Sequence, residues 1–115
     1  MVAFRGSLNN STRKRLSRRQ TEENLEIPKD ITRYRCIGAE YADLARGTLQ
    51  FAHYTGNIKP WDHAAGILIH SEAGGYSGYS DSGKPYLPSP PHRDRAIIIA
   101  PGSAAWARLR DLTSI

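Results

Sequence analysis

One segment limits the fold more than any other. Residues 96–100 read Ala-Ile-Ile-Ile-Ala, with no polar side chain between them. A strand that faces water on one side alternates apolar and polar residues, whereas a continuous apolar strand has to be covered on both faces. Helices packed on both sides of a sheet provide that cover. The segment therefore predicts a layered α/β fold in which helices flank the sheet.

The rest of the chain alternates between strand-like and helix-like segments. Asn9, Asn10 and Ser11 are good helix caps, Pro60 is tolerated in a first helical turn, and Gly74 ends a helical pattern. The predicted strands cover residues 3–8, 31–37, 48–54, 76–80 and 96–100, and the predicted helices cover about 11–23, 39–46, 60–73 and 103–112.

Positive charge is concentrated in the first third of the chain. The formal net charge is +5; residues 1–35 hold nine Lys or Arg against four Asp or Glu, and the remaining residues are balanced. Five of these cations lie between Arg13 and Arg19. Such a cluster can bind nucleic acid phosphates or form the wet face of a helix. No aromatic residue lies among the charges, which favours the solvated helix.

The single cysteine, Cys36, cannot form an internal disulfide and is expected to be a buried apolar thiol beside a strand. The N-terminus lacks the apolar run of a signal peptide, and no stretch is apolar enough to span a membrane. These features predict a soluble cytoplasmic protein. His63 and His70 lie seven residues apart, too far for a typical helical zinc pair, so surface or core roles are expected.

Asp62 is the main candidate for chemistry. It falls in the first turn of the helix that begins at Pro60, after a strand and a loop. The helix dipole favours a carboxylate there, and ligands of open α/β sheets bind at the edge where the strands end. The small residues Ala64, Ala65 and Gly66 allow close helix packing. From the pattern alone, Asp62 is either a helix cap or a ligand-binding carboxylate.

The string Trp61-Asp62-His63-Ala64-Ala65-Gly66, followed by residues 72–75, Glu-Ala-Gly-Gly, resembles the second signature of the inositol monophosphatase family. The resemblance implies the mixed, helix-flanked sheet of that family's second α/β domain. Residues 30–115 correspond to this C-terminal domain, and residues 1–29 match its start loosely, as a strand and a basic helix. The resemblance also implies that Asp62 binds a catalytic Mg²⁺, and that Gly38, Ala39, Glu40 and Thr55 line the substrate side.

Two departures from the family pattern affect the expected function. Many members have a glutamate seven residues before the aspartate, where this chain has Thr55, whereas Glu40 either supplies a carboxylate to the pocket or faces solvent. The first signature, Asp-Pro-x-Asp-Gly-Thr, does not occur. Family chemistry is attack of a metal-activated water on a phosphate monoester, and one carboxylate cannot organise it.

The resemblance therefore implies a Mg²⁺-dependent phosphomonoesterase of sugar or polyol phosphates, of which this chain is the C-terminal half, weakly active or inactive alone. An N-terminal domain or a homodimer is the expected partner. The alternatives are a non-catalytic remnant or interaction domain, and a basic nucleic-acid-binding protein.

Overall fold

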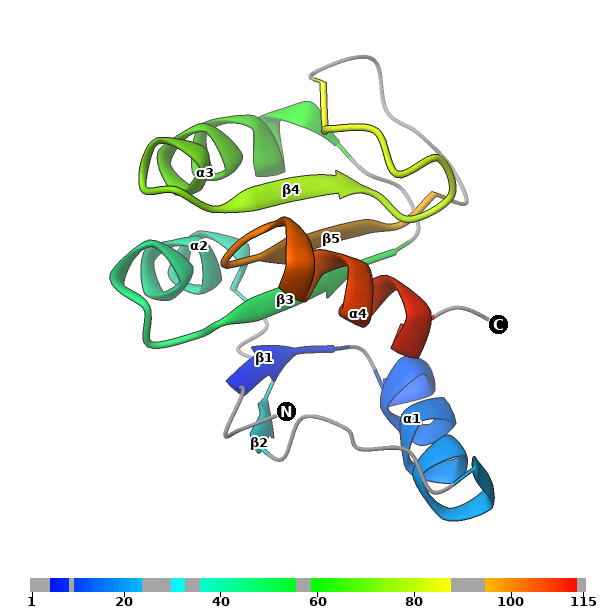
Figure 1. Ribbon diagram of the computed structural model, residues 1–115. Helices are drawn as coiled ribbons and strands as arrows, with labels where there is room; N and C mark the ends of the chain where they lie inside the picture. Colours follow the sequence, from blue (N-terminus) through cyan, green and yellow to red (C-terminus); the bar gives the residue numbers. More distant parts are fainter. Residues whose placement is uncertain are drawn as a thin grey trace.

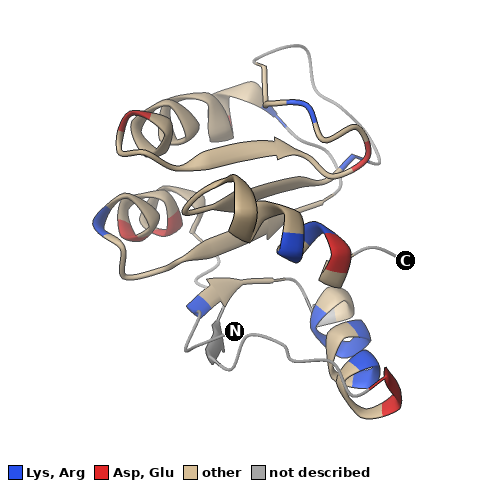
Figure 2. Cartoon of the chain, in the orientation of Figure 1, with Lys and Arg blue, Asp and Glu red and all other residues tan. Residues whose placement is uncertain are grey.

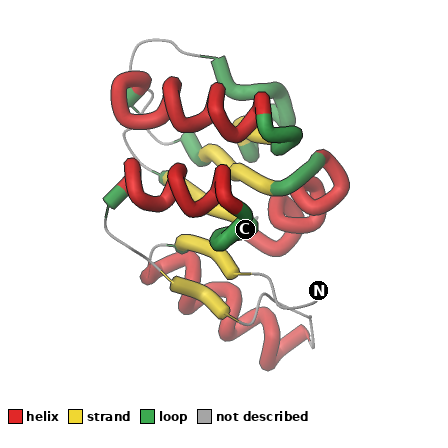
Figure 3. Tube along the Cα trace, turned by 90° about the vertical axis from the view of Figure 1, so that its left-hand side faces the viewer, coloured by secondary structure: helices red, strands yellow, loops and turns green. Residues whose placement is uncertain are grey.

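The computed structural model describes residues 5–8, 10–23, 30–32, 36–55, 59–87 and 95–113. In these residues one sheet of five strands lies between two layers of helices (Figures 1 and 3). The elements follow the chain as β1 (Arg5–Ser7), α1 (Asn10–Glu23), β2 (Asp30–Thr32), α2 (Ile37–Arg46), β3 (Phe51–Tyr54), α3 (Pro60–Glu72), β4 (Tyr76–Tyr79), β5 (Ile97–Ala100) and α4 (Ser103–Thr113). The predicted α/β fold with a mixed, helix-flanked sheet is confirmed.

The sheet has the strand order β2-β1-β3-β5-β4. β1 runs parallel to both β2 and β3, whereas β5 is antiparallel to both β3 and β4. Every strand except β5 therefore ends at the same edge of the sheet. We call it the C-terminal edge; α2 and α3 begin there, after β2 and β3. β1 comes from the loosely matching residues 1–29, yet it pairs with two strands of residues 30–115 in one sheet.

Two hydrophobic clusters cover the two faces of the sheet. On one face, Ile97 and Ile99 pack with side chains of α2 and α3, such as Leu44 and Ile67. On the other face, Ile98 packs with α1 and α4 residues. All three isoleucines are completely buried. The apolar run is thus covered on both sides, as its composition requires.

Helices α1 and α4 lie on the same face of the sheet and meet near the C-terminal end of α4 (Figure 1). Leu16 and Leu109 are buried in that layer. The Arg19 guanidinium donates hydrogen bonds to the carbonyl oxygens of Asp111 and Leu112, at 2.8 and 2.7 Å. Figure 2 shows α1 as the most basic element of the chain, with Lys14 and Arg18 exposed to solvent.

Several boundaries differ from the sequence expectation. The strand predicted over 48–54 begins only at Phe51, because Gly47 ends α2 in the left-handed conformation (φ 81°) and the chain turns before it extends. In the segment predicted as a strand over 31–37, Ile37 is already helical. Residues 33–35 and the proline-rich loop at 88–91 lie outside the described residues.

The prediction of a buried Cys36 is wrong. The thiol is exposed, because Cys36 is the residue that precedes the first turn of α2 instead of part of a strand. Among the described residues, no helix is long and apolar enough to cross a membrane.

Candidate functional site

Asp62 lies in the first turn of α3, at the C-terminal edge of the sheet. Pro60 starts the helix, and the Asp62 backbone N–H donates to the carbonyl of Lys59 at 3.1 Å. The Asp62 side chain is exposed, and its carboxylate accepts no hydrogen bond from the described part of the chain. The carboxylate is therefore not used as a helix cap there, and it remains open to a ligand.

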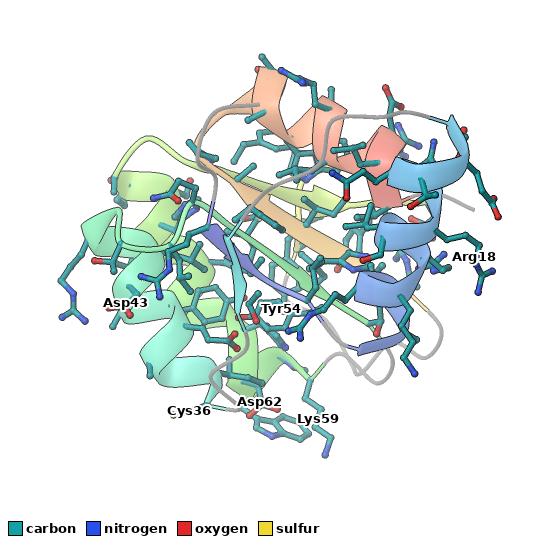
Figure 4. All side chains as sticks on the ribbon, turned by 90° about the horizontal axis from the view of Figure 1, so that it is seen from below. Arg18, Cys36, Asp43, Tyr54, Lys59 and Asp62 are labelled. Atoms are coloured by element: carbon teal, nitrogen blue, oxygen red, sulfur yellow. The ribbon has the colours of Figure 1, made fainter. Side chains whose placement is uncertain are left out.

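The start of α2 lies at the same edge as Asp62. In Figure 4, Cys36, Lys59 and Asp62 lie along one margin of the molecule, and Tyr54 lies further in. Helices α2 and α3 pack closely against each other. The Tyr41 ring of α2 lies so near to Gly66 of α3 that a Cβ on Gly66 would overlap it. The prediction that Gly66 permits close helix packing is confirmed.

A groove of about 300 Å³ runs between α2 and α3. Gly38 and Asp62, from the first turns of the two helices, line one end, and mostly apolar or small side chains line the rest: Tyr41, Ala42, Ala45, Ala65, Gly66 and Ile69. The structure thus brings two of the predicted site residues together. Ala39, Glu40 and Thr55 do not line this groove.

The other predicted site residues differ in exposure. Gly38 and Ala39 are exposed in the first turn of α2, and a Cβ on Gly38 would meet open space. Thr55 is exposed directly after β3. Glu40 is only 3% exposed, which excludes the alternative that it faces solvent. The Tyr54 hydroxyl donates to Glu40 Oε1 at 3.3 Å, and Glu40 Oε2 is buried without a hydrogen-bond partner among the described residues.

Three aromatic side chains contact one another next to Glu40, and Tyr54 links them to its carboxylate. The Tyr41 hydroxyl and His63 Nδ1 share a hydrogen bond of 2.8 Å, and the Tyr54 ring lies edge-on to the His63 ring with centroids 4.8 Å apart. Tyr41 and Tyr54 stack at 5.8 Å. We call Glu40, Tyr41, Tyr54 and His63 the aromatic–carboxylate cluster. It joins α2, β3 and α3.

Burial keeps the ring residues of the cluster uncharged. It raises the pKa of Tyr41, and burial together with the nearby Glu40 raises the pKa of Tyr54. Burial lowers the pKa of His63, against a smaller opposing effect of Asp62. His63 is buried, as is His70, so of the expected surface or core roles the structure gives both histidines the core role.

The sequence did not reveal this cluster, because its two hydrogen-bonded pairs are 14 and 22 residues apart and meet only after three elements pack. One signal was available. Tyr41 and Tyr54 are polar aromatics within a predicted helix and a predicted strand, and a tyrosine hydroxyl that becomes buried there usually finds a partner.

The described residues offer one donor that suits a metal ion. The exposed carboxylate of Asp62, for which the described part of the chain provides no ion-pair partner, is an oxygen ligand of the kind that Mg²⁺ prefers. Among the described residues, however, no three His, Cys, Asp or Glu side chains come together in a group that could hold a metal ion. Asp62 fits the role of one ligand, and a complete site needs donors from elsewhere.

Comparison with known proteins gives one consistent result. Residues 3–111 match the sequence profile of the inositol monophosphatase family. This chain is 34% identical to the Arabidopsis thaliana protein named Phosphatase IMPL1, chloroplastic, over 85 residues. That match covers 69% of this chain and 22% of the Arabidopsis protein.

Solved structures show the same fold. A Pyrococcus horikoshii protein described as similar to inositol-1 monophosphatase, PH1897, superimposes on 100% of this chain with a TM-score of 0.77 and 21% identity. SaIMPase-II bound to inositol monophosphate matches 96% of it, with a TM-score of 0.66 and 20% identity. Each match covers 44% of the solved chain, so this chain spans less than half the length of these relatives.

Proposed function

Because the chain belongs to the inositol monophosphatase family, we propose that it forms part of a Mg²⁺-dependent phosphomonoesterase in which Asp62 supplies one metal ligand. The supporting observation is the exposed carboxylate of Asp62, placed in the first turn of α3 beside the start of α2. The remaining carboxylates would come from an N-terminal domain, either on a longer protein or in a separate chain. The chain alone would then show weak or no turnover.

The residues of this chain would act mainly by binding and orientation. Mg²⁺, when held there, would supply positive charge to a phosphate group. Asp62 would bind the cation. Helices α2 and α3 begin at the same edge, and the positive end of each helix dipole favours a phosphate anion there. Gly38, Ala39 and Thr55 would contact the substrate from the exposed positions that they occupy.

The proposed substrate is a phosphorylated polyol or sugar. SaIMPase-II, which shares the fold, was solved with inositol monophosphate bound. Glu40 would shape the substrate side from its buried position instead of replacing the glutamate that many members have at the place of Thr55. A homodimer is a second proposed assembly. The cytoplasmic location remains a prediction from the sequence; the Arabidopsis relative is named as chloroplastic.

Magnesium binding to the full chain tests the metal ligand directly. In a titration followed by NMR, Mg²⁺ is expected to shift the backbone amides around Asp62, and Asp62→Asn should abolish these shifts. Glu72→Gln is the matched control, because Glu72 is an exposed carboxylate at the other end of the same helix. Shifts that persist in Asp62→Asn would contradict the proposal.

Phosphate release from inositol 1-phosphate tests the catalytic part. We expect release by the chain alone to stay near the background rate at every Mg²⁺ concentration. Any Mg²⁺-dependent release should disappear in Asp62→Asn and persist in Glu72→Gln. Efficient hydrolysis that does not depend on Asp62 would refute the assignment of this side chain.

A further inference from the structure

The aromatic–carboxylate cluster forms a closed set of contacts between three elements. Tyr54, the last residue of β3, bonds Glu40 of α2 at 3.3 Å and packs against His63 of α3 at 4.8 Å. His63 in turn shares its 2.8 Å hydrogen bond with Tyr41, the neighbour of Glu40 on α2. The first turns of the two helices are therefore tied both to each other and to the end of the central strand.

Stability alone does not account for this arrangement. Glu40 is 3% exposed, and its Oε2 atom is buried without a partner among the described residues. A buried carboxylate with incomplete hydrogen bonding costs free energy, and apolar residues of similar volume often stabilise such a position better. A buried group that costs stability and still holds the Tyr54 hydroxyl is typical of a site whose geometry matters.

The position of the cluster indicates which geometry it fixes. His63 directly follows Asp62, and one turn further along α3 the Tyr41 ring packs on Gly66. Tyr41 thus contacts α3 at two successive turns, beginning at the residue beside the exposed carboxylate. The Asp62 carboxylate is exposed and receives no hydrogen bond within the described part of the chain that would fix its direction.

We propose that Glu40, Tyr41, Tyr54 and His63 are positioning residues, which hold the first turn of α3, and with it Asp62, against the first turn of α2. This inference rests on the proposed function, because it gives Asp62 the role of a metal ligand. None of the four touches the metal in this scheme. They act as the supporting groups of a metal site do, by reducing the number of orientations open to the ligand.

Removing single hydroxyl groups tests the inference with little change in volume. Tyr41→Phe deletes the bond to His63 but keeps the ring against Gly66, and Tyr54→Phe deletes the bond to Glu40. Supporting groups of metal sites typically contribute about 10-fold or more to metal affinity. We expect each variant to weaken Mg²⁺ binding at Asp62 by roughly that factor, measured from the NMR titration of the full chain.

A matched control separates positioning from general loss of stability. The Tyr76 hydroxyl donates to the Gly83 carbonyl at 3.0 Å, on the other face of the sheet, so Tyr76→Phe loses a comparable bond. This variant should bind Mg²⁺ as the wild type does, even if its melting temperature falls equally. Equal weakening of Mg²⁺ binding in Tyr76→Phe and Tyr41→Phe would overturn the inference.

A second measurement does not depend on metal. The ¹⁵N order parameters of residues 61–64 should fall in Tyr41→Phe and Tyr54→Phe and stay unchanged in Tyr76→Phe. Unchanged order parameters in the first two variants would overturn the positioning role. If instead the wild type shows no Asp62-dependent Mg²⁺ shift, the proposed metal ligand fails, while the order parameters still decide whether the cluster fixes the helix start.

Discussion

Gly66 of α3 shows at the scale of one residue how closely the two helices beside the site approach. A Cβ at this position would overlap the Tyr41 ring, so the substitution Gly66→Ala forces α2 or the ring to move. Such overpacking destabilises proteins by about 1–3 kcal/mol. We expect a loss of that size in the free energy of unfolding, measured by urea denaturation.

Gly38 provides the control for this substitution. It also lies in a helix, yet an added Cβ would meet nothing within 4 Å. Alanine has the higher helix propensity, so Gly38→Ala should be neutral or stabilise the chain by up to about 1 kcal/mol. Equal effects of the two substitutions would contradict the close packing of α2 on α3.

At the scale of elements, the contact between α1 and α4 depends on one arginine of the basic cluster. Arg19 donates to two carbonyl groups in the last turn of α4, which have no partner within the helix. It also pairs with Glu23, but both side chains are partly exposed, so solvent weakens that ion pair. Arg19→Ala should reduce the free energy of unfolding by about 1 kcal/mol.

The neighbouring Arg18 distinguishes this contact from the charge of the helix. It is exposed on the same helix, and Arg18→Ala removes the same charge. Its effect on the free energy of unfolding should stay within about 0.5 kcal/mol. Urea unfolding of both variants at one salt concentration compares their free energies of unfolding. A larger loss of that free energy in Arg18→Ala than in Arg19→Ala would show that the charge of the helix matters more than the contact with α4.

The order of elements could be predicted from the sequence, because local patterns determine it. The apolar residues 97–99, the proline at the start of α3 and the glycine after α2 mark their elements without tertiary information. The same local reasoning placed Asp62 at a helix start. It could not reveal the bond between Tyr54 and Glu40, which forms across two elements. It misjudged Cys36 because α2 begins at Ile37, within the segment predicted as a strand over 31–37.

At the scale of the whole molecule, buried histidines make the fold sensitive to acid. Burial lowers the pKa of His53 to about 4, helped by Arg15, and burial also lowers the pKa values of His63 and His70. Between pH 6.5 and 4 the unfolded chain binds protons that the folded chain does not. The contribution of the neutral histidines to the free energy of unfolding is therefore complete above pH 6.5, and it is lost as the pH is lowered through this range.

His53 alone should account for a loss of about 3 kcal/mol between pH 7 and pH 4, since each pKa unit corresponds to about 1.4 kcal/mol. Urea unfolding at several pH values measures this dependence. His53→Gln removes one titrating group and should flatten the curve without abolishing it, because the other two histidines remain. A curve of unchanged slope in this variant would show that His53 is not the main contributor.

The place of β1 between β2 and β3 has a consequence for how the chain assembles. β1 ends at residue 7, but its partners β2 and β3 begin at residues 30 and 51, and β3 receives its other neighbour only from residues 97–100. During synthesis the sheet cannot be completed until nearly the whole chain has emerged. Pairings that distant in sequence are slow to form, so unpaired strand edges are exposed to aggregation for longer than in a sheet of neighbouring hairpins.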